Sequence, residues 1–264
     1  MTAYRARGCR PKTLAWYGTI LRALARRHRL LPSEPGPIEA FLSDLPPVSD
    51  ETRFDYWRGL RTFYRWAADR LGVPNAMNAV GRPLRGRHRI PPSLSEPEVL
   101  RTMAAARSRR DKALLALLLD TGLRVGEAHS LRWENIQPDV ITVTGKVGDR
   151  VVPILDWTRW ALLGVDLPWT GRKGPITKDG LGQAVRRCLR RAGVQHGTVH
   201  ILRHTFARLY LRGGGDVFSL QQIMGHANIA TTRIYAELER ADVVERHHRF
   251  SPIVRLLEQA AGSQ

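Results

Sequence analysis

The chain has 264 residues, more than the ~100–200 expected of one domain, which favours one large domain or two modest ones. Apolar residues make up 43% of the sequence and charged residues 25%, and this composition excludes a wholly disordered chain. The 42 Lys and Arg residues outnumber the 24 Asp and Glu residues, which leaves a net charge of +18. So large an excess, spread over both halves of the chain, favours a polyanionic partner, with nucleic acid ahead of an anionic membrane surface.

Cysteine content and hydropathy indicate where such a protein works. Cys9 and Cys188 are the two cysteines, and their spacing fits neither a disulfide framework nor a zinc site. The longest apolar run, residues 113–119, is far shorter than the ~20 residues needed to cross a bilayer. We therefore expect a soluble, cytosolic protein that has no membrane partner.

The first 80 residues predict a small helical domain. Apolar residues at helical spacing indicate helices over residues 13–29, 38–45 and from Ser49 to about residue 70. Residues 81–93, rich in Arg, Pro and Gly, predict an interdomain linker. The first helix, the third helix and the linker carry arginines that either contact nucleic-acid phosphates or form a solvated face: Arg22, Arg26, Arg53, Arg58, Arg61, Arg65, Arg85 and Arg87.

Residues 94–264 predict a second, mostly helical domain. Ser95 and Glu98 form a capping box that begins a helix to about residue 107, and Gly122 ends an apolar helix over residues 111–120. Two β-branched runs, residues 140–144 and 150–154, predict a hairpin. Further helices are expected over residues 178–192, 199–213, 216–224, 228–239 and 241–259. The predicted fold class is mainly α with two domains, the second containing a small β-sheet or hairpin.

Four local patterns in the second domain carry residues suited to chemistry. Arg124 lies in the turn T-G-L-R-V-G-E, and Lys146 lies at the tip of the hairpin. His200 and Arg203 form an H-x-x-R pair. Gly225 and His226 form a Gly-His pair, and Tyr235 lies nine residues after this histidine.

Each pattern also has an ordinary explanation. The two cations can be surface charges, the histidine after Gly225 can interact with a helix dipole, and the tyrosine can be an aromatic at the edge of the core. His200 and His204, four residues apart, have the spacing of a metal clip, but the pair lacks the Glu of H-E-x-x-H.

Taken together and in this order, the patterns resemble the tyrosine recombinase (phage integrase) family, in particular compact prophage and actinobacterial phage integrases and Xer-type recombinases. The resemblance covers about residues 94–250 and extends more weakly to residues 1–80, which look like the family's core-binding domain. Met224 stands where leucine is common before the Gly-His pair. The positions that match the family's active residues are Arg124, Lys146, His200, Arg203, His226 and Tyr235, and Glu127 matches the acidic residue that supports the first arginine.

The resemblance implies site-specific recombination of double-stranded DNA. Tyr235 would attack the scissile phosphate and form a 3′-phosphotyrosyl bond, while Arg124 and Arg203 stabilise charge on the phosphate oxygens. His200 would act as general base and Lys146 as general acid on the leaving 5′ oxygen, and the remaining histidine would brace the phosphate. No metal or nucleotide cofactor is implied.

The implied partners are attachment sites on double-stranded DNA, a homotetramer on two duplexes linked through a C-terminal helix, and accessory or directionality proteins. Three alternatives stay open: a chromosome-dimer resolving recombinase, a type IB topoisomerase, and a DNA-binding regulator that does not catalyse the reaction. The full set of six matching positions argues against the regulator.

Overall fold

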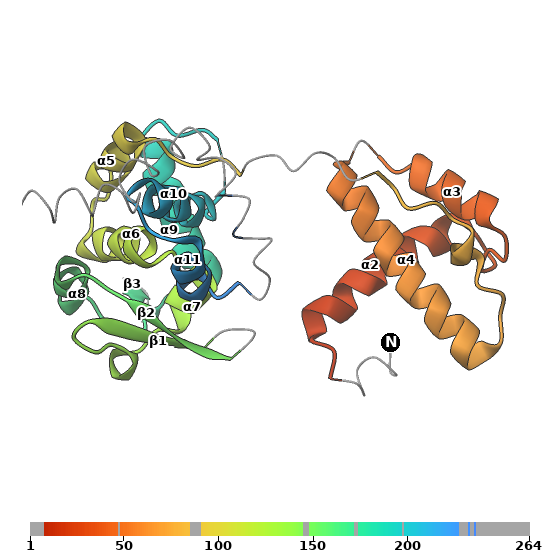
Figure 1. Cartoon of the computed structure of the whole chain (residues 1–264), viewed down its shortest axis with the longest axis horizontal. Helices are drawn as coiled ribbons and strands as arrows, with labels where there is room; N and C mark the ends of the chain where they lie inside the picture. The colour runs from red at the N-terminus through yellow and green to blue at the C-terminus, as the bar shows by residue number, and fades with distance from the viewer. Residues whose placement is uncertain are drawn as a thin grey trace, which may run out of the picture. The chain divides into compact units, whose positions relative to one another are not determined.

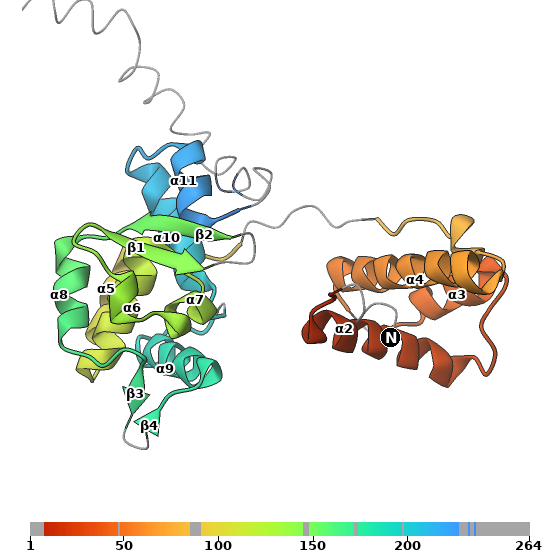
Figure 2. The ribbon, with the colours of Figure 1, turned by 90° about the horizontal axis from the view of Figure 1, so that it is seen from below.

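The computed structural model describes residues 8–46, 48–84, 91–144, 148–171, 174–196 and 198–226, together with Thr232 and Tyr235. The chain divides into two compact units, Met1–Arg89 and Ile90–Gln264, and each is described by itself. The first unit contains α2 (Pro11–Arg27), α3 (Pro35–Ser43), α4 (Asp50–Leu71) and the short 3₁₀ helix η1 (Ala76–Asn78). Figures 1 and 2 show these elements from two sides.

Helix α4 is the longest element described in the first unit, and its ends follow the local sequence. The Ser49 hydroxyl accepts a hydrogen bond from the Thr52 backbone N–H at 3.2 Å, and Gly72 ends the helix in the left-handed region at φ +65°. One face of α4 buries Trp57, Leu60 and neighbouring apolar side chains against α2 and α3. A Cβ atom on Gly59 would lie 2.5 Å from Ile20 Cδ1, so the glycine permits the close approach of α2 and α4.

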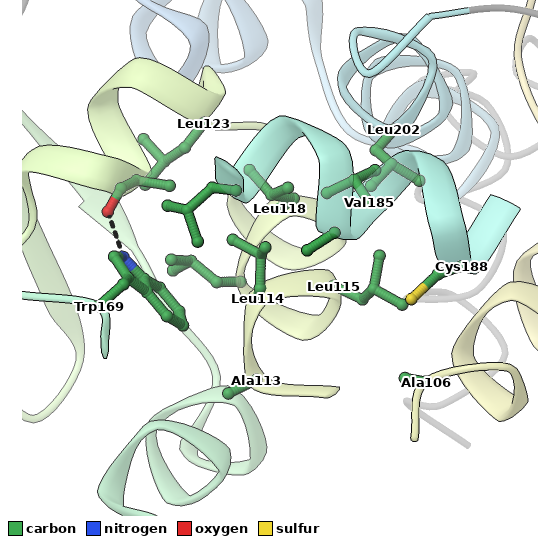
Figure 3. Packing of buried hydrophobic residues seen from close by; sticks show 14 of the residues in the cluster. Ala106, Ala113, Leu114, Leu115, Leu118, Leu123, Trp169, Val185, Cys188 and Leu202 are labelled. Atoms are coloured by element: carbon green, nitrogen blue, oxygen red, sulfur yellow. Dashed lines mark hydrogen bonds between the residues drawn. The ribbon is translucent and has the colours of Figure 1, made fainter. Parts of the chain in front are cut away.

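The second unit is built around α6 (Arg109–Thr121), a helix whose side chains are buried on nearly all sides. It packs against α5 (Glu96–Ala104), α7 (Val125–Ser130), α8 (Asp156–Leu163), α9 (Lys178–Arg191) and α10 (Ile201–Arg212). Figure 3 shows Leu114, Leu115 and Leu118 in the middle of this core, with Val185 and Leu202 contributed by α9 and α10. The core thereby connects the segments that carry the candidate site.

Two antiparallel hairpins complete the second unit. Strands β1 (Val140–Thr144) and β2 (Asp149–Pro153) pair from Val140 with Pro153 to Thr144 with Asp149, and α11 (Val217–Met224) packs against β2. The short strands β3 (Thr170–Gly171) and β4 (Gly174–Pro175) form the other hairpin, and η2 (Trp133–Asn135) precedes β1.

The mainly helical fold class and the β1–β2 hairpin are confirmed. The capping box is also present, since Glu98 Oε2 accepts from the backbone N–H and from the hydroxyl of Ser95, both at 2.8 Å. The sequence did not predict α8, where Trp157 and Trp160 are exposed and only Thr158 and Leu162 are buried. Because Trp157, Trp160 and Leu163 are exposed, the apolar residues of α8 do not mark its buried face, and the sequence pattern gives no sign of an amphipathic helix. The expected helices over residues 228–239 and 241–259 lie outside the described residues, apart from Thr232 and Tyr235.

Candidate active site

The turn after α6 positions Arg124. Gly122 ends α6 at φ +61°, and a Cβ atom there would lie 2.3 Å from the Phe206 ring, so glycine is required for the conformation and for the packing of α10. Arg124 is the residue before α7, and its backbone N–H donates to Glu127 Oε2 at 2.8 Å while Nη1 donates to Glu127 Oε1 at 2.9 Å. The Arg124 side chain remains 42% exposed. The carboxylate thus holds a guanidinium that stays partly accessible to solvent.

Arg203, in the first turn of α10, is a buried cation that connects two distant turns. Its Nη1 donates to the Gly122 carbonyl at 2.5 Å, and its Nη2 donates to the Met224 carbonyl at 2.6 Å and to His226 Nε2 at 3.1 Å. The side chain is almost fully buried. Burial, with Arg124 nearby, lowers the pKa of Arg203 to about 10, so it stays charged at neutral pH.

His226 follows Gly225, which ends α11 in the left-handed region at φ +62°. Burial, reinforced by Arg203, lowers the pKa of His226 to about 4, so the ring is neutral at pH 7. Because an arginine can only donate, Nε2 accepts from Arg203 and the ring hydrogen lies on Nδ1. Nδ1 then donates to the Thr232 hydroxyl at 2.8 Å, which fixes the tautomer and the ring orientation.

Arg150 belongs to the same cluster although the sequence reading missed it. Its Nη1 and Nη2 donate to the two Glu127 carboxylate oxygens at 3.0 and 2.9 Å, and its Nε donates to the Ile223 carbonyl at 2.9 Å. Burial by itself raises the pKa of Glu127, but the hydrogen bonds from Arg150 and from the Arg124 backbone, with the charges of both arginines, lower it to about 2. The period-two alternation of β2 was an available signal, because Arg150 shares the inward face with buried Val152.

Tyr235 is only 4% exposed and packs among Phe206, Leu220 and Met224 of α10 and α11. Its hydroxyl lies 2.5 Å from His204 Nδ1. Burial raises the pKa of Tyr235, and the charge of Arg203 partly offsets that effect. The phenol therefore keeps its proton at neutral pH and lies within the electrostatic reach of the buried guanidinium.

His200 is exposed at the residue before α10, and no hydrogen bond of its ring is recorded among the described residues. Burial of part of the ring, with the charges of Arg203, Arg124 and Lys178, lowers its pKa. Lys178, the first residue of α9, is a second residue that the sequence reading missed. Its Cε would lie 3.3 Å from a Cβ atom on Gly126, so the lysine side chain lies against the start of α7, and its charge acts on His200.

The structure thus brings together most of the residues selected from the sequence. Hydrogen bonds join Glu127 to Arg124 and Arg150, and a separate hydrogen bond joins Arg203 to His226. The two groups interact electrostatically, as do Tyr235 and His200 with Arg203. Lys146 lies outside the described residues, between the ends of β1 and β2. We use the name arginine cluster for Arg124, Arg150, Arg203, Glu127 and His226.

The arginines predicted to contact DNA in the first unit have mixed environments. Arg22, Arg26 and Arg65 are exposed on α2 and α4. Arg58 is paired with Asp55 at 2.8 Å and lies over the Trp16 ring, and Arg61 lies over the Trp57 ring. Arg53 is half-buried with a weak contact to Asp50 at 3.9 Å, and Arg85 and Arg87 lie outside the described residues.

Two further properties bear on the class of site. Across the part of the chain that the structure describes, no group of three or more His, Cys, Asp or Glu residues has the arrangement of a metal site. None of the described helices combines the length and the hydropathy that a bilayer crossing needs.

Comparison with known proteins agrees with the geometry. A tyrosine recombinase XerC of Erythrobacter litoralis (strain HTCC2594) is 35% identical over 232 residues, covering 78% of this chain and 74% of the relative. A tyrosine recombinase XerD of Caulobacter vibrioides (strain ATCC 19089 / CIP 103742 / CB 15) is 31% identical over 285 residues, covering 89% of this chain and 90% of the relative.

Among solved structures, a lambda integrase tetramer bound to a Holliday junction has the same fold, with a TM-score of 0.72 and 21% identity over 86% of this chain and 75% of that chain. The model of the phage integrase family matches residues 92–241, the segment that holds the whole arginine cluster. With its fold, its cluster and these relatives in agreement, the chain belongs to the phage integrase family, the tyrosine recombinases.

Proposed function

We propose that this chain is a site-specific DNA recombinase that cleaves and rejoins DNA through a 3′-phosphotyrosyl intermediate. The observation that carries the proposal is the position of a protonated phenol, Tyr235, beside a buried guanidinium, Arg203, in a cluster of fixed cationic donors. A phosphodiester carries one negative charge, which is the charge that such a cluster binds.

The charge distribution supports a docking position for the phosphate. Arg124 keeps 42% of its side chain exposed, His200 and Lys178 are exposed as well, and the charges of Arg124 and Lys178 both act on His200. Arginine donors stabilise the additional negative charge that develops on the phosphate oxygens as the phosphorane forms. Glu127 holds Arg124, and main-chain carbonyls hold Arg203. The two arginines therefore need little reorganisation when DNA binds.

The reaction then follows from the roles assigned to the residues. The Tyr235 oxygen gives up its proton to a general base, the role that the family resemblance gives to His200, and forms a bond to phosphorus. The bond between phosphorus and the 5′ oxygen breaks in the same step, and Lys146 gives the 5′ oxygen its proton. Attack by a 5′-hydroxyl of a second duplex reverses the step and joins new strands. Each step uses side chains of this chain alone, so we expect cleavage to persist in the presence of a metal chelator.

We further propose that residues 1–80 form a core-binding domain, residues 81–93 a linker along the DNA, and residues 94–264 the catalytic domain. The exposed arginines of α2 and α4 would contact phosphates on the duplex. A homotetramer on two duplexes is proposed by analogy with the lambda integrase tetramer bound to a Holliday junction. Accessory or directionality proteins belong to the same proposal.

The proposal can be tested with a nicked suicide duplex. The duplex carries a site that the protein selects from a random-sequence pool. The wild type should form a covalent adduct, whereas Tyr235→Phe should bind the duplex with unchanged affinity and form none. Tyr210→Phe is the matched control, because Tyr210 is a partly buried tyrosine of α10 that packs against the same apolar cluster. An adduct with Tyr235→Phe, or none with the wild type, would overturn the proposal.

Resolution of chromosome dimers is a second candidate function, favoured by the relatives named XerC and XerD. Such a protein would act on one short site together with a second, related recombinase. Strand exchange between two copies of the selected site by this chain alone would favour the integrase role, and exchange that needs a second recombinase would favour dimer resolution.

A further inference from the structure

His204 has a position in the site that none of the six matched residues accounts for. It follows Arg203 in the first turns of α10, and its Nδ1 lies 2.5 Å from the Tyr235 hydroxyl. The two rings have centroids 5.8 Å apart and are tilted by 38°, so the contact is made through the ring edges and polar atoms. Within the part of the chain that the structure describes, His204 is the hydrogen-bond partner of the Tyr235 hydroxyl.

The direction of this hydrogen bond follows from the charge state of both groups. Burial, with His200 and Arg203 nearby, lowers the pKa of His204 to about 4, so the ring is neutral at pH 7. Burial raises the pKa of Tyr235, so the phenol keeps its hydrogen. The phenol therefore donates to an unprotonated Nδ1, and the ring hydrogen of His204 lies on Nε2.

We propose that His204 orients Tyr235 and accepts its proton during DNA cleavage. As the phenol oxygen bonds to phosphorus, its O–H bond breaks and the proton passes to His204 Nδ1, while the 5′ oxygen leaves with a proton from a separate donor. The inference rests on the proposed function and deepens it, because it assigns the proton of the nucleophile to His204 and not to His200, the general base that the family resemblance implies. His200, exposed at the start of α10, is then left to bind the phosphate.

The scissile phosphate itself favours this transfer. A histidine among cations is a weak base, as the low pKa of His204 shows. A phosphodiester bound at Arg124 and Arg203 adds a negative charge that offsets both guanidinium groups, and the neighbouring ring becomes more basic. The proton acceptor would thus gain its strength only once DNA is in place, which restricts attack to the bound complex.

Two substitutions separate an acceptor of protons from a packing residue. His204→Asn places an amide oxygen near the position of Nδ1 and keeps a hydrogen-bond acceptor, but it takes up no proton. His204→Leu removes both properties. His196→Asn is the matched control, because His196 is half exposed, lies 4.0 Å from Glu98 and belongs to neither group of the candidate site.

The readout is the single-turnover rate of adduct formation on the suicide duplex, from about pH 6 to about pH 10. The wild-type rate should level off once His204 is unprotonated. In His204→Asn and His204→Leu, hydroxide must remove the proton, so the rate at neutral pH should fall by about 10²-fold or more and rise with pH up to the phenol pKa. Difluorotyrosine at position 235, a more acidic phenol, should restore more of the rate in both variants than it adds to the wild type.

A structural role gives a different result. If His204 only supports packing, His204→Asn and His204→Leu will lose activity in parallel with duplex binding or melting temperature. Their pH profiles will then keep the wild-type shape, and difluorotyrosine will rescue nothing; that result overturns the inference. In the wild type, the ¹⁵N shifts of His204 should show a hydrogen on Nε2 and respond to Tyr235→Phe, and a hydrogen on Nδ1 would also overturn it.

The failure of this inference differs from the failure of the proposed function. If the wild type forms an adduct that Tyr235→Phe abolishes, while the His204 variants keep wild-type profiles, only the role of His204 is wrong. If the wild type forms no adduct, both are wrong.

Discussion

Replacing Glu127 by glutamine tests whether the arginine cluster is held together by one buried carboxylate. Glu127 accepts hydrogen bonds from Arg124 and from both Nη atoms of Arg150, and its side chain is 9% exposed. The substitution removes the charge but keeps the size, so the two arginines lose their counter-charge while the packing is preserved. We expect Glu127→Gln to fold with lower stability and to bind DNA with a disordered Arg124.

The magnitude follows from the pKa of Glu127. Its shift from the ordinary value of 4.5 to about 2, at about 1.4 kcal/mol for each pH unit, corresponds to roughly 3 kcal/mol of unfolding free energy at neutral pH. A similar loss, about 3–5 kcal/mol, is typical when one partner of a buried ion pair is removed. Because the folded-state pKa is the lower one, this contribution is complete above about pH 4.5 and disappears as the pH falls toward 2.

Urea denaturation of both proteins measures this difference at neutral pH and at steps down to the acid limit of folding. Wild type and Glu127→Gln should differ by about 3 kcal/mol at neutral pH and converge below pH 4.5. Glu134→Gln, at an exposed glutamate of η2, should change stability by less than about 0.5 kcal/mol. A difference between wild type and Glu127→Gln that stays constant through the acid range would refute the ion-pair reasoning.

Three further predictions concern other features. Gly122→Ala should lose more stability in urea than Gly72→Ala, because both have positive φ but only Gly122 faces the Phe206 ring; equal losses would contradict the packing argument. Lys178→Met should lower the slope of log affinity against log salt by about 1, and exposed Lys112→Met should not; an unchanged slope would exclude a phosphate contact at Lys178. Fully buried Cys188, whose pKa burial raises, should react with a thiol reagent only on unfolding, and labelling as fast as that of Cys9 would contradict this burial.

The sequence predicted most of the helices because their ends are determined locally. Ser49, Ser95, Gly72 and Gly122 cap their helices as expected, and the bounds differ from the predicted ones by a few residues. Helix α8 was missed because its burial depends on neighbours brought together by tertiary packing. Only Thr158 and Leu162 of this helix are buried, which leaves almost no periodic signal.

The same distinction applies to the site. Arg124, Arg203 and His226 lie in short motifs that a single sequence can show, whereas Arg150 and Lys178 gain their roles from elements folded next to them. His204 was considered only as a metal ligand paired with His200. Its contact with Tyr235 joins residues 31 positions apart in the sequence, so no spacing rule within one helix could predict it.

The groups that fix Arg203 have a consequence for how this site tolerates change. Two of its three hydrogen-bond acceptors are peptide oxygens, at Gly122 and Met224. A main-chain oxygen is present whatever the residue, so the identity of the side chain at position 224 leaves this restraint intact. Random mutagenesis should therefore remove the hydrogen bonds of the Arg203 guanidinium to these carbonyls only by changing the backbone path or by replacing the arginine itself. Chemically diverse replacements at position 224 that fill the same volume should keep these hydrogen bonds.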